Sequence, residues 1–177
     1  MLPFLHVPLY TLREIFKETG DMSVRRAEDK DIPRLKELLL QVLNIHAEGR
    51  PDIFIPNTTK YSDEELREMI RCENTPVFVD TDAQDNVIGY AMCIVQHRLH
   101  SSNMTDIITV FIDDLCVDQN VRHSGCGRRI YDAVKDYALS IGAYHITLNV
   151  WTCNPSAIAF YESIGLSKME YIMEEIL

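Results

Sequence analysis

The stretch Val121-Arg122-His123-Ser124-Gly125-Cys126-Gly127-Arg128-Arg129 decides how the rest of the chain is interpreted. It comes after a long apolar run, 107–117, and opens a helical pattern that extends to about Ile141. A strand, a turn with glycines and a helix start place several backbone N–H groups around one concavity. Such groups bind phosphate, because the first amides of a helix lack internal partners and carry partial positive charge. The stretch therefore predicts a phosphate-binding turn, although a glycine turn that merely ends a strand has the same appearance.

Two features of this turn suit a phosphate ligand. Gly125 and Gly127 lack side chains, so the backbone can approach a ligand closely and adopt unusual φ and ψ values. Arg122 and Arg128 add positive charge at the mouth of the turn. Whether the turn belongs to a complete site depends on the rest of the sequence.

The composition is that of an ordinary globular domain with an acidic balance. Of the 177 residues, 46% are hydrophobic and 25% are charged, and the formal net charge is −10. No stretch approaches the ~18 uninterrupted apolar residues that a membrane span requires. So acidic a chain is also poorly suited to nucleic acid. We therefore expect no membrane and no nucleic-acid partner, but a cationic or amine-bearing substrate.

The cysteines indicate a reducing compartment. They are odd in number and widely spaced, and they are Cys72, Cys93, Cys116, Cys126 and Cys153. They form no CxxC pair and no Cys/His cluster with the spacing of a zinc site. The sequence therefore predicts free thiols in the cytoplasm and no metal.

Residues 1–21 differ from the rest of the chain and are interpreted as an N-terminal extension. Pro3 and Pro8 interrupt the apolar residues at its start and oppose a helix there. The segment has neither a basic start nor a small-residue cleavage site, so a secretory signal is not expected. Residues 22–177 are expected to form one domain, and the sequence leaves open whether Met22 is the true start.

From residue 22 on, hydrophobic periodicity predicts both strands and helices. Asp29 or Asp31 caps a first helix, and Ser62 with Glu65 forms a capping box for a second one. The expected strands are 23–27, 77–79, 87–98, 106–117, 145–151 and 169–176, and two further helices come after the glycine turn and Asn154. The run 106–117 is apolar on both faces, which is typical of a central strand covered on both sides.

A second motif, Asn154-Pro-Ser-Ala157-Ile-Ala-Phe160-Tyr161-Glu-Ser-Ile-Gly165-Leu166, comes after the predicted strand 145–151. The turn matches Arg/Gln-x-x-Gly-x-Gly/Ala in full, and the second motif is close to Asn-x-x-Ala-x-x-Phe-Tyr-x-x-x-Gly-Phe, with Leu166 at the last position. Over about residues 22–177 the chain therefore resembles the GCN5-related N-acetyltransferase (GNAT) superfamily. The resemblance implies an α/β (α+β) fold: a mixed, mostly antiparallel sheet of about six to seven strands, splayed near its centre, with helices on both faces.

The resemblance also implies acetyl-CoA as co-substrate. Its pyrophosphate is expected on the turn, which comprises Arg122, His123, Ser124, Gly125, Cys126, Gly127 and Arg128. The amides of its pantetheine arm are expected to pair with the strand backbone of Leu115, Cys116 and Val117. The second motif is expected to add contacts from Asn154, Ala157 and Phe160.

Family resemblance places Tyr161 beside the thioester sulfur. Asn154 and Tyr161 lie two helical turns apart and therefore on one face of the last helix. A phenol has a pKa near 10 and a thiol one near 8.5, so Tyr161 can hydrogen-bond and protonate a departing thiolate. A helical tyrosine is also commonly a half-buried core residue, but the motif favours Tyr161 as general acid.

The base that deprotonates the acceptor amine has several candidates. Asp113 and Asp114 interrupt an apolar run, and this pair resembles the acidic pair before the same strand segment in polyamine acetyltransferases. Adjacent strand residues point to opposite faces, so only one of the two is expected to face a given cleft. One interpretation is that the carboxylate facing the cleft acts as the base, either directly or through a water molecule. The other interpretation is that one of the two aspartates caps the first helix or binds the substrate ammonium. His46, His97 and a water chain are lesser candidates.

Three residues between the first two predicted helices are candidates for binding the acceptor. They are Glu48, Asp52 and Tyr61, in the region where the superfamily usually builds the acceptor wall. A solvated loop is the other interpretation of this segment.

Together these residues predict an acetyl-CoA-dependent N-acetyltransferase that moves acetyl to a primary amine of a small molecule or peptide by direct attack. The alternative is a non-catalytic acyl-CoA-binding or regulatory module of the same fold, which Tyr161 and the acidic pair disfavour. A covalent route through Cys116 or Cys126 needs an activating group aimed at the sulfur and is not expected. A Rossmann domain is disfavoured because the turn lacks GxGxxG. The acceptor, and whether the chain forms a homodimer, stay open.

Overall fold

The computed structural model describes residues 24–177, in four α-helices and a five-stranded sheet. The proposed N-terminal extension, 1–21, and Met22 lie outside the described residues. The elements in chain order are β1 (Val24–Arg26), a 3-10 turn η1 (Asp29–Asp31), α2 (Ile32–Gly49), α3 (Asp63–Arg71), β2 (Val77–Thr81), β3 (Val87–Arg98), β4 (Ile107–Val117), a 3-10 turn η2 (Gln119–Val121), α4 (Cys126–Ser140), β5 (His145–Leu148) and α5 (Pro155–Ser163).

The sheet has the order β1-β2-β3-β4-β5. Its first four strands are antiparallel, and β5 joins β4 in parallel. The mixed, mostly antiparallel architecture is confirmed, but the expected count of six to seven strands is wrong, because five are present in the described residues. The difference lies at the C-terminus, where 169–176 carries a strand-like sequence yet pairs with no other strand of the described chain.

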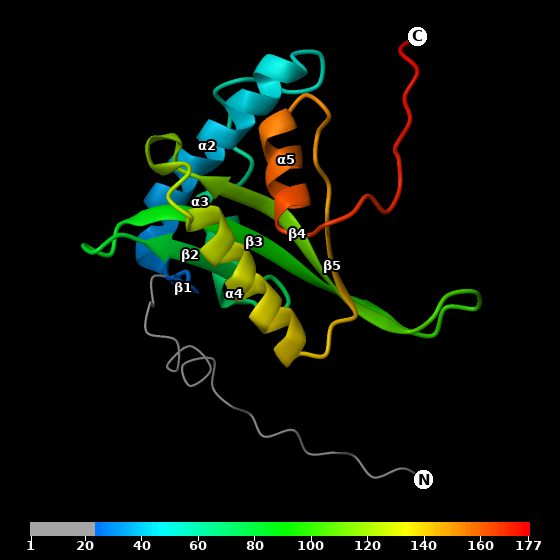
Figure 1. Ribbon diagram of the computed structural model, residues 1–177. Coiled ribbons are helices and arrows are strands. Elements are labelled where there is room, and N and C mark those ends of the chain that lie inside the picture. The colour runs from blue at the N-terminus through cyan, green and yellow to red at the C-terminus, as the bar shows by residue number, and fades with distance from the viewer. Residues whose placement is uncertain (1–23) are drawn as a thin grey trace.

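Helices cover both faces of the sheet, as Figure 1 shows. On one face, Leu35 and Leu38 of α2 and Leu66 of α3 pack with Tyr90 and Met92 of β3, and all five are buried. On the other face, α4 presents Ile130 and Val134 to strand residues that include Phe78, Ala91 and Val110. Each large apolar side chain buried in this way contributes roughly 1.5–3 kcal/mol. The two cores result from the alternation along β3, whose neighbours Tyr90 and Ala91 face opposite layers.

The helix starts differ in how they are capped. At α3 the predicted capping box is present, because Ser62 Oγ accepts from Glu65 N at 3.2 Å and Glu65 Oε2 accepts from Ser62 N at 2.8 Å. At α2, Asp31 occupies the N-cap position without capping the helix through its side chain. Its carboxylate instead accepts from Glu28 N at 2.8 Å, and it forms a buried ion pair with Arg25 at 2.7 Å.

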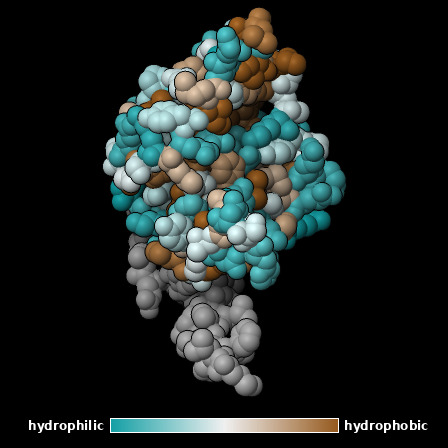
Figure 2. Space-filling model, turned by 90° about the vertical axis from the view of Figure 1, so that its right-hand side faces the viewer, coloured by the Kyte–Doolittle hydropathy of each residue, from teal (hydrophilic) through white to brown (hydrophobic). Residues whose placement is uncertain are grey.

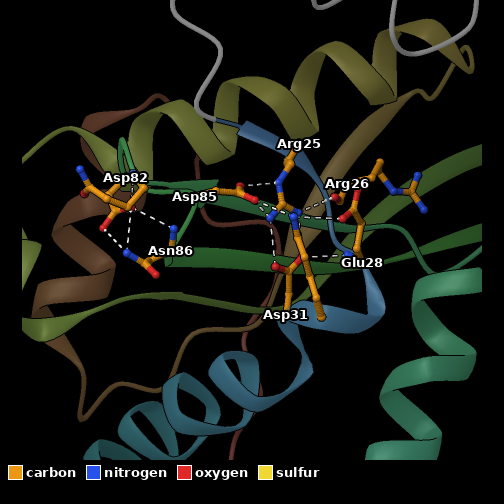
Figure 3. A network of polar contacts seen from close by, with 9 residues as sticks. Arg25, Arg26, Glu28, Asp31, Asp82, Asp85 and Asn86 are labelled. Carbon is orange, nitrogen blue, oxygen red and sulfur yellow. Dashed lines mark hydrogen bonds and ion pairs between the residues drawn. The ribbon is translucent and has the colours of Figure 1, made fainter.

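A polar network ties the start of α2 to the β2–β3 turn. Figure 3 shows Arg25 of β1 between the carboxylates of Asp31 and Asp85. Lys30 also binds Asp85, at 2.6 Å, while Asp82 closes the turn through Asn86 N at 2.9 Å. The network fixes the first turn of α2 against the sheet, and that turn carries Arg34 toward the end of β4.

The ladder between β4 and β5 is short. It pairs Thr109 with His145 and ends at Ile112 with Leu148, whereas β4 continues to Val117. The sheet is therefore open on the β5 side of residues 113–117, in the region where a splay is expected. Within residues 24–177, no helix is long and apolar enough to cross a membrane.

Candidate active site

The glycine turn is built from the left-handed residues that its sequence suggests. Gly125 has φ +83° and is the N-cap of α4, and His123 has φ +65°. Residues 122–125 are exposed, so their backbone groups are accessible to a ligand. Cys126 is buried and its sulfur packs under Gly89, so only its backbone faces the turn. The first amides of α4 therefore follow directly on an exposed turn, where an anion can reach them.

Two ion pairs hold this turn from behind. Arg129 binds the buried carboxylate of Asp80 at 2.7 Å and donates to the Ser124 carbonyl at 3.1 Å. Arg34 of α2 binds Asp118, whose side chain also accepts from Asn120 N at 2.9 Å in η2. Burial alone raises the pKa of Asp118, but these hydrogen bonds outweigh it and lower that pKa overall. The backbone of the turn is thus positioned by contacts that leave its outer side accessible.

Gly127 brings the two sequence motifs together. A Cβ atom at this position would lie 3.1 Å from Cζ of Phe160 and 3.5 Å from Cγ2 of Val117. The missing side chain therefore lets α5 approach α4 and the end of β4. Asn154 caps α5 by accepting from Ala157 N at 3.1 Å. Val117, Gly127 and Phe160, three residues near or in the expected acetyl-CoA site, thus come together from β4, α4 and α5.

A β-bulge places both acidic residues on one side of β4. The β3–β4 register pairs Met92 with Asp114 and Cys93 with Ile112, which leaves Asp113 as an extra residue. The expectation that only one of the two carboxylates faces a given cleft is therefore wrong. Lys60 Nζ lies 2.8 Å from Oδ2 of Asp113 and 3.6 Å from Oδ2 of Asp114. Neither aspartate caps the first helix.

Two tyrosines complete the surroundings of the acidic pair. Tyr61 donates to Asp113 at 2.6 Å, and Tyr90 donates to Asp114 at 3.0 Å. Burial raises the pKa of Asp114, and the charge of Lys60 offsets part of that effect. Burial is the largest single effect on Lys60 and lowers the pKa of its ammonium, but the hydrogen bond to Asp113 and the charges of Asp114 and Asp113 together outweigh burial and raise that pKa. The site therefore holds a charged lysine against one partly exposed and one nearly buried carboxylate.

Tyr161 lies on α5, close enough for the charge of Asp114 to act on its phenol. Burial, followed by the charges of Asp114 and Cys116, raises the pKa of its phenol well above 10. Tyr161 is therefore protonated at neutral pH, and its O–H is available as a hydrogen-bond donor. Burial likewise raises the pKa of Cys116 to about 12 and that of Cys126 still further, which keeps both thiols protonated and argues against a covalent cysteine route.

The three candidate acceptor-binding residues lie in different places. Tyr61 joins the acidic pair through Asp113. Asp52 instead binds Arg50 at 2.7 Å, which lowers the pKa of Asp52. Glu48 lines a surface hollow of about 420 Å³ together with Arg122 of the turn. Of the three, the structure brings only Tyr61 to the carboxylates.

The two histidines considered as the base, His46 and His97, lie in different parts of the structure. His46 stacks near Phe54, with ring centroids 5.2 Å apart, and Phe54 meets Trp151 edge-on at 5.1 Å. Burial and the charge of Lys60 lower the pKa of His46, which keeps it neutral. His97 is exposed and pairs with Ile108, far along β4 from Asp113.

Sequence reasoning missed Lys60, Tyr90 and the aromatic cluster of His46, Phe54 and Trp151. Tyr90 has the pattern of a core residue, and Lys60 sits in a loop without periodicity. The acidic pair itself was the available signal, because two adjacent carboxylates in an apolar strand require a cationic or hydrogen-bonding partner. In the described part of the chain, no group of three or more His, Cys, Asp or Glu residues is placed to hold a metal ion.

Comparison with known proteins identifies the family of this chain. A sequence model described as the Acetyltransferase (GNAT) family matches residues 39–166, which include the acidic pair, the glycine turn and α5. The chain belongs to the GNAT acetyltransferase family. The two motifs predicted this membership, and it is confirmed. No match is found among curated protein sequences.

Solved structures show the same fold. A mutant of the BH1408 protein from Bacillus halodurans is 30% identical with a TM-score of 0.85, covering 88% of this chain and 99% of that one. An aminoglycoside acetyltransferase from an uncultured soil metagenomic sample, in complex with sisomicin, is 19% identical with a TM-score of 0.65, covering 87% and 93%. Aminoglycoside N-acetyltransferase AAC(6')-Iy in complex with CoA is 15% identical with a TM-score of 0.64, covering 87% and 98%. The last two similarities concern the fold alone.

Proposed function

We propose that this GNAT protein transfers the acetyl group of acetyl-CoA to a primary amine of a small molecule or peptide by direct attack. The observation that carries the proposal is the position of the acidic pair. Asp113 and Asp114 lie at the bulge where β4 loses its β5 partner, directly before Leu115 to Val117 and the glycine turn. A proton-accepting group thus adjoins the backbone that the family uses for its acetyl donor.

The donor is assigned to the open end of β4, the turn and α5. The unpaired side of Leu115 to Val117 offers backbone groups to the two amides of a pantetheine arm. The backbone amides of the turn, 123–128, suit the pyrophosphate together with Arg122. Phe160 on α5 lies against Gly127, and Ala157 is on the same helix.

The acceptor is assigned to the place that Lys60 occupies. The Lys60 ammonium lies against Asp113 and Asp114, and an acceptor amine arrives at neutral pH as an ammonium of the same kind. We infer that the acceptor displaces Lys60 and takes over its contacts to the carboxylates. The acidic net charge of −10 favours the approach of such a cation.

The proton transfers are assigned to the two perturbed groups. Asp114, whose pKa is raised, takes a proton from the acceptor ammonium directly or through Asp113 and water. The free amine forms the C–N bond at the thioester carbonyl, and the C–S bond breaks as the tetrahedral intermediate collapses. Tyr161 gives its proton to the departing thiolate, and the proton released from the nitrogen restores the phenol. The products are the amide and CoA as a thiol.

Thiol release from acetyl-CoA across a panel of amines tests this function. The panel comprises polyamines, amino sugars, amino acids, aminoglycosides, and peptides with free N-termini or lysines. We expect thiol release above background with at least one amine, together with a mass increase of that amine by one acetyl group. Saturable acetyl-CoA binding without thiol release on every amine would instead support a non-catalytic acyl-CoA-binding module.

A further inference from the structure

Lys60 lies in the loop between α2 and α3, and its placement is unusual for a lysine. In this loop Ile55 is 71% exposed, whereas the side chain of Lys60 is only 39% exposed. Figure 2 shows apolar side chains gathered at the upper end of the molecule, the end where Figure 1 places the C-terminal end of α2 and the start of this loop. Isoleucine is ordinarily the more buried of the two residue types. The loop thus exposes an isoleucine and directs a lysine to the acidic pair, Asp113 and Asp114.

The loop is anchored on either side of Lys60. Asn57 N donates to Oδ1 of Asn44 on α2 at 3.1 Å, and the Tyr61 hydroxyl donates to Asp113 at 2.6 Å. Between these anchors, Lys60 Nζ lies 2.8 Å from one carboxylate of the acidic pair and 3.6 Å from the other. The chain itself therefore supplies a primary amine at the two carboxylates.

This amine lies next to the groups that the proposed function assigns to the reaction. Asp114 is directly followed by Leu115, the first residue of the backbone segment assigned to the donor. Tyr161, assigned to protonate the thiolate, is close enough for the charge of Asp114 to act on its phenol. An amine held beside the donor reacts as in an intramolecular step, with an effective concentration far above that of a dissolved amine. Lys60 is thus placed as a bound acceptor would be.

We propose that Lys60 is itself an acetyl acceptor, which the chain acetylates within its own site when acetyl-CoA is bound and no external amine is present. The inference rests on the proposed function, because it uses the same donor, base and acid. It adds a modification site to that function, and the site lies on the protein itself.

The self-acetylation has the same proton balance as the transfer to an external amine. Asp114 takes one proton from the Lys60 ammonium and later releases it to solvent. The freed Nζ forms the C–N bond at the thioester carbonyl, and the C–S bond breaks as the tetrahedral intermediate collapses. Tyr161 protonates the departing thiolate, and the second proton lost by the nitrogen restores the phenol. The products are acetylated Lys60, CoA as a thiol, and one proton.

The product limits the reaction to one acetyl group at this position. Acetylation removes the positive charge of the side chain and with it the ion pairs to both carboxylates. An amide nitrogen is not a nucleophile for a second transfer. We therefore expect one acetyl group per chain at Lys60, whereas turnover of an external amine continues.

Incubation of the full chain with acetyl-CoA and no amine tests the proposal, with peptide mass mapping of each lysine over time. Lys36 is the matched internal control, since its side chain is 38% exposed against 39% for Lys60, and it also pairs with an aspartate, Asp63. We expect Lys60 to be acetylated at least about 100-fold faster than Lys36. The rate constant should not depend on protein concentration, because the amine and the donor site are on one chain.

Variants of the assigned base and acid separate this reaction from chemical acetylation by dissolved acetyl-CoA. Labelling of Lys60 should slow by about 10-fold or more in Tyr161→Phe, and by more in Asp113→Asn/Asp114→Asn, while labelling of Lys36 stays unchanged. Because both lysines are measured on the same chain, a variant that fails to fold is recognised by similar labelling of the two.

Three results overturn the proposal. The first is similar labelling of Lys60 and Lys36 in the folded wild-type chain, and the second is a rate constant that rises with protein concentration. The third is an unlabelled Lys60 in a preparation that acetylates an amine of the panel, in which case the proposed function stands. Labelled Lys60 without turnover of any panel amine supports the proposal. Failure of both reactions contradicts the proposed function as well.

Discussion

The donor half and the acceptor half of the proposed site are built in different ways. The donor half is Leu115–Val117, the turn 122–128 and the α5 residues Asn154, Ala157 and Phe160, and it offers mainly backbone groups, from the first two of these segments. The acceptor half is Lys60, Tyr61, Tyr90, Asp113 and Asp114, and it offers side chains from the α2–α3 loop, β3 and the bulge of β4. A site made of backbone groups tolerates substitution of most side chains, whereas a site made of converging side chains loses function when any one of them is replaced. We therefore expect the two halves to respond to substitution separately.

The largest effect is expected from a side chain in the glycine turn. Gly125→Val forces a β-branched residue into φ +83° and places its Cβ 3.3 Å from Arg129 Nη1. We expect the acetyl-CoA Kd to rise by about 100-fold or more, as measured by calorimetry, because the amide array is distorted. Gly142→Val is the control, since it imposes a similar strain at φ +68° with no atom within 4 Å of the added Cβ. Equal losses of acetyl-CoA affinity in the two variants would contradict a phosphate role for the turn.

A smaller but separate loss is expected at the general acid. Tyr161→Phe should lower kcat by about 10-fold or more, in the range for loss of one general acid, with little change in acetyl-CoA affinity. Steady-state thiol release measures the first quantity and calorimetry the second. Tyr144→Phe, at an exposed tyrosine, is the control and should retain full activity. An unchanged kcat in Tyr161→Phe removes this residue from the proposed chemistry.

Substitution of Asp113 and of Asp114 should have different effects on the pH dependence of activity. Because burial raises the pKa of Asp114, activity falls as the pH drops through that pKa, and Asp114→Asn should lower kcat and abolish the limb. Asp113→Asn should retain a limb. The raised pKa of Asp114 also lowers the free energy of unfolding at pH values above that pKa, because the folded state binds the proton more tightly than the unfolded state does. Asp114→Asn should therefore raise the melting temperature at neutral pH, and a pH–rate profile with no limb lost in either variant would place the base elsewhere.

The smallest effect is expected from the lysine that occupies the acceptor position. The charge of Lys60 lowers the pKa of Asp114, so Lys60→Met should move the acidic limb to higher pH. It should also lower the KM for the amine by a few-fold, because the acceptor no longer competes with Lys60 (about 1 kcal/mol at most for a partly exposed pair). Lys36→Met, which removes a surface ion pair with Asp63, is the control. A higher KM in Lys60→Met would mean that Lys60 assists the acceptor.

The sequence predicts the donor half better than the acceptor half, and the reason is physical. Gly125 and Gly127 indicate local backbone requirements at their own positions. Gly125 has a positive φ, and Gly127 allows Phe160 to approach closely. The cap at Asn154 and the capping box at Ser62 are equally local, and both are present. Local signals of this kind can be recognised in the sequence without knowledge of the tertiary structure.

The features that sequence reasoning missed all depend on distant partners. Strict alternation along β4 would put Asp113 and Asp114 on opposite faces, but a bulge against β3 interrupts that alternation. No residue type in β4 predicts the bulge. Lys60 reaches the pair from a loop 53 residues away in sequence. The segment 169–176 has a strand-like composition, yet a strand requires a neighbour, and the described chain supplies none.

The separation of the two halves is tested most directly by the acetyl-CoA affinity of the double variant Asp113→Asn/Asp114→Asn. We predict a Kd within about 3-fold of the wild-type value by calorimetry, because the carboxylates belong to the acceptor half. The same protein should lose about 100-fold or more in kcat/KM for the best amine of the panel. A loss of acetyl-CoA affinity as large as the loss of kcat/KM would show that the acidic pair holds the donor, and would contradict the division of the site.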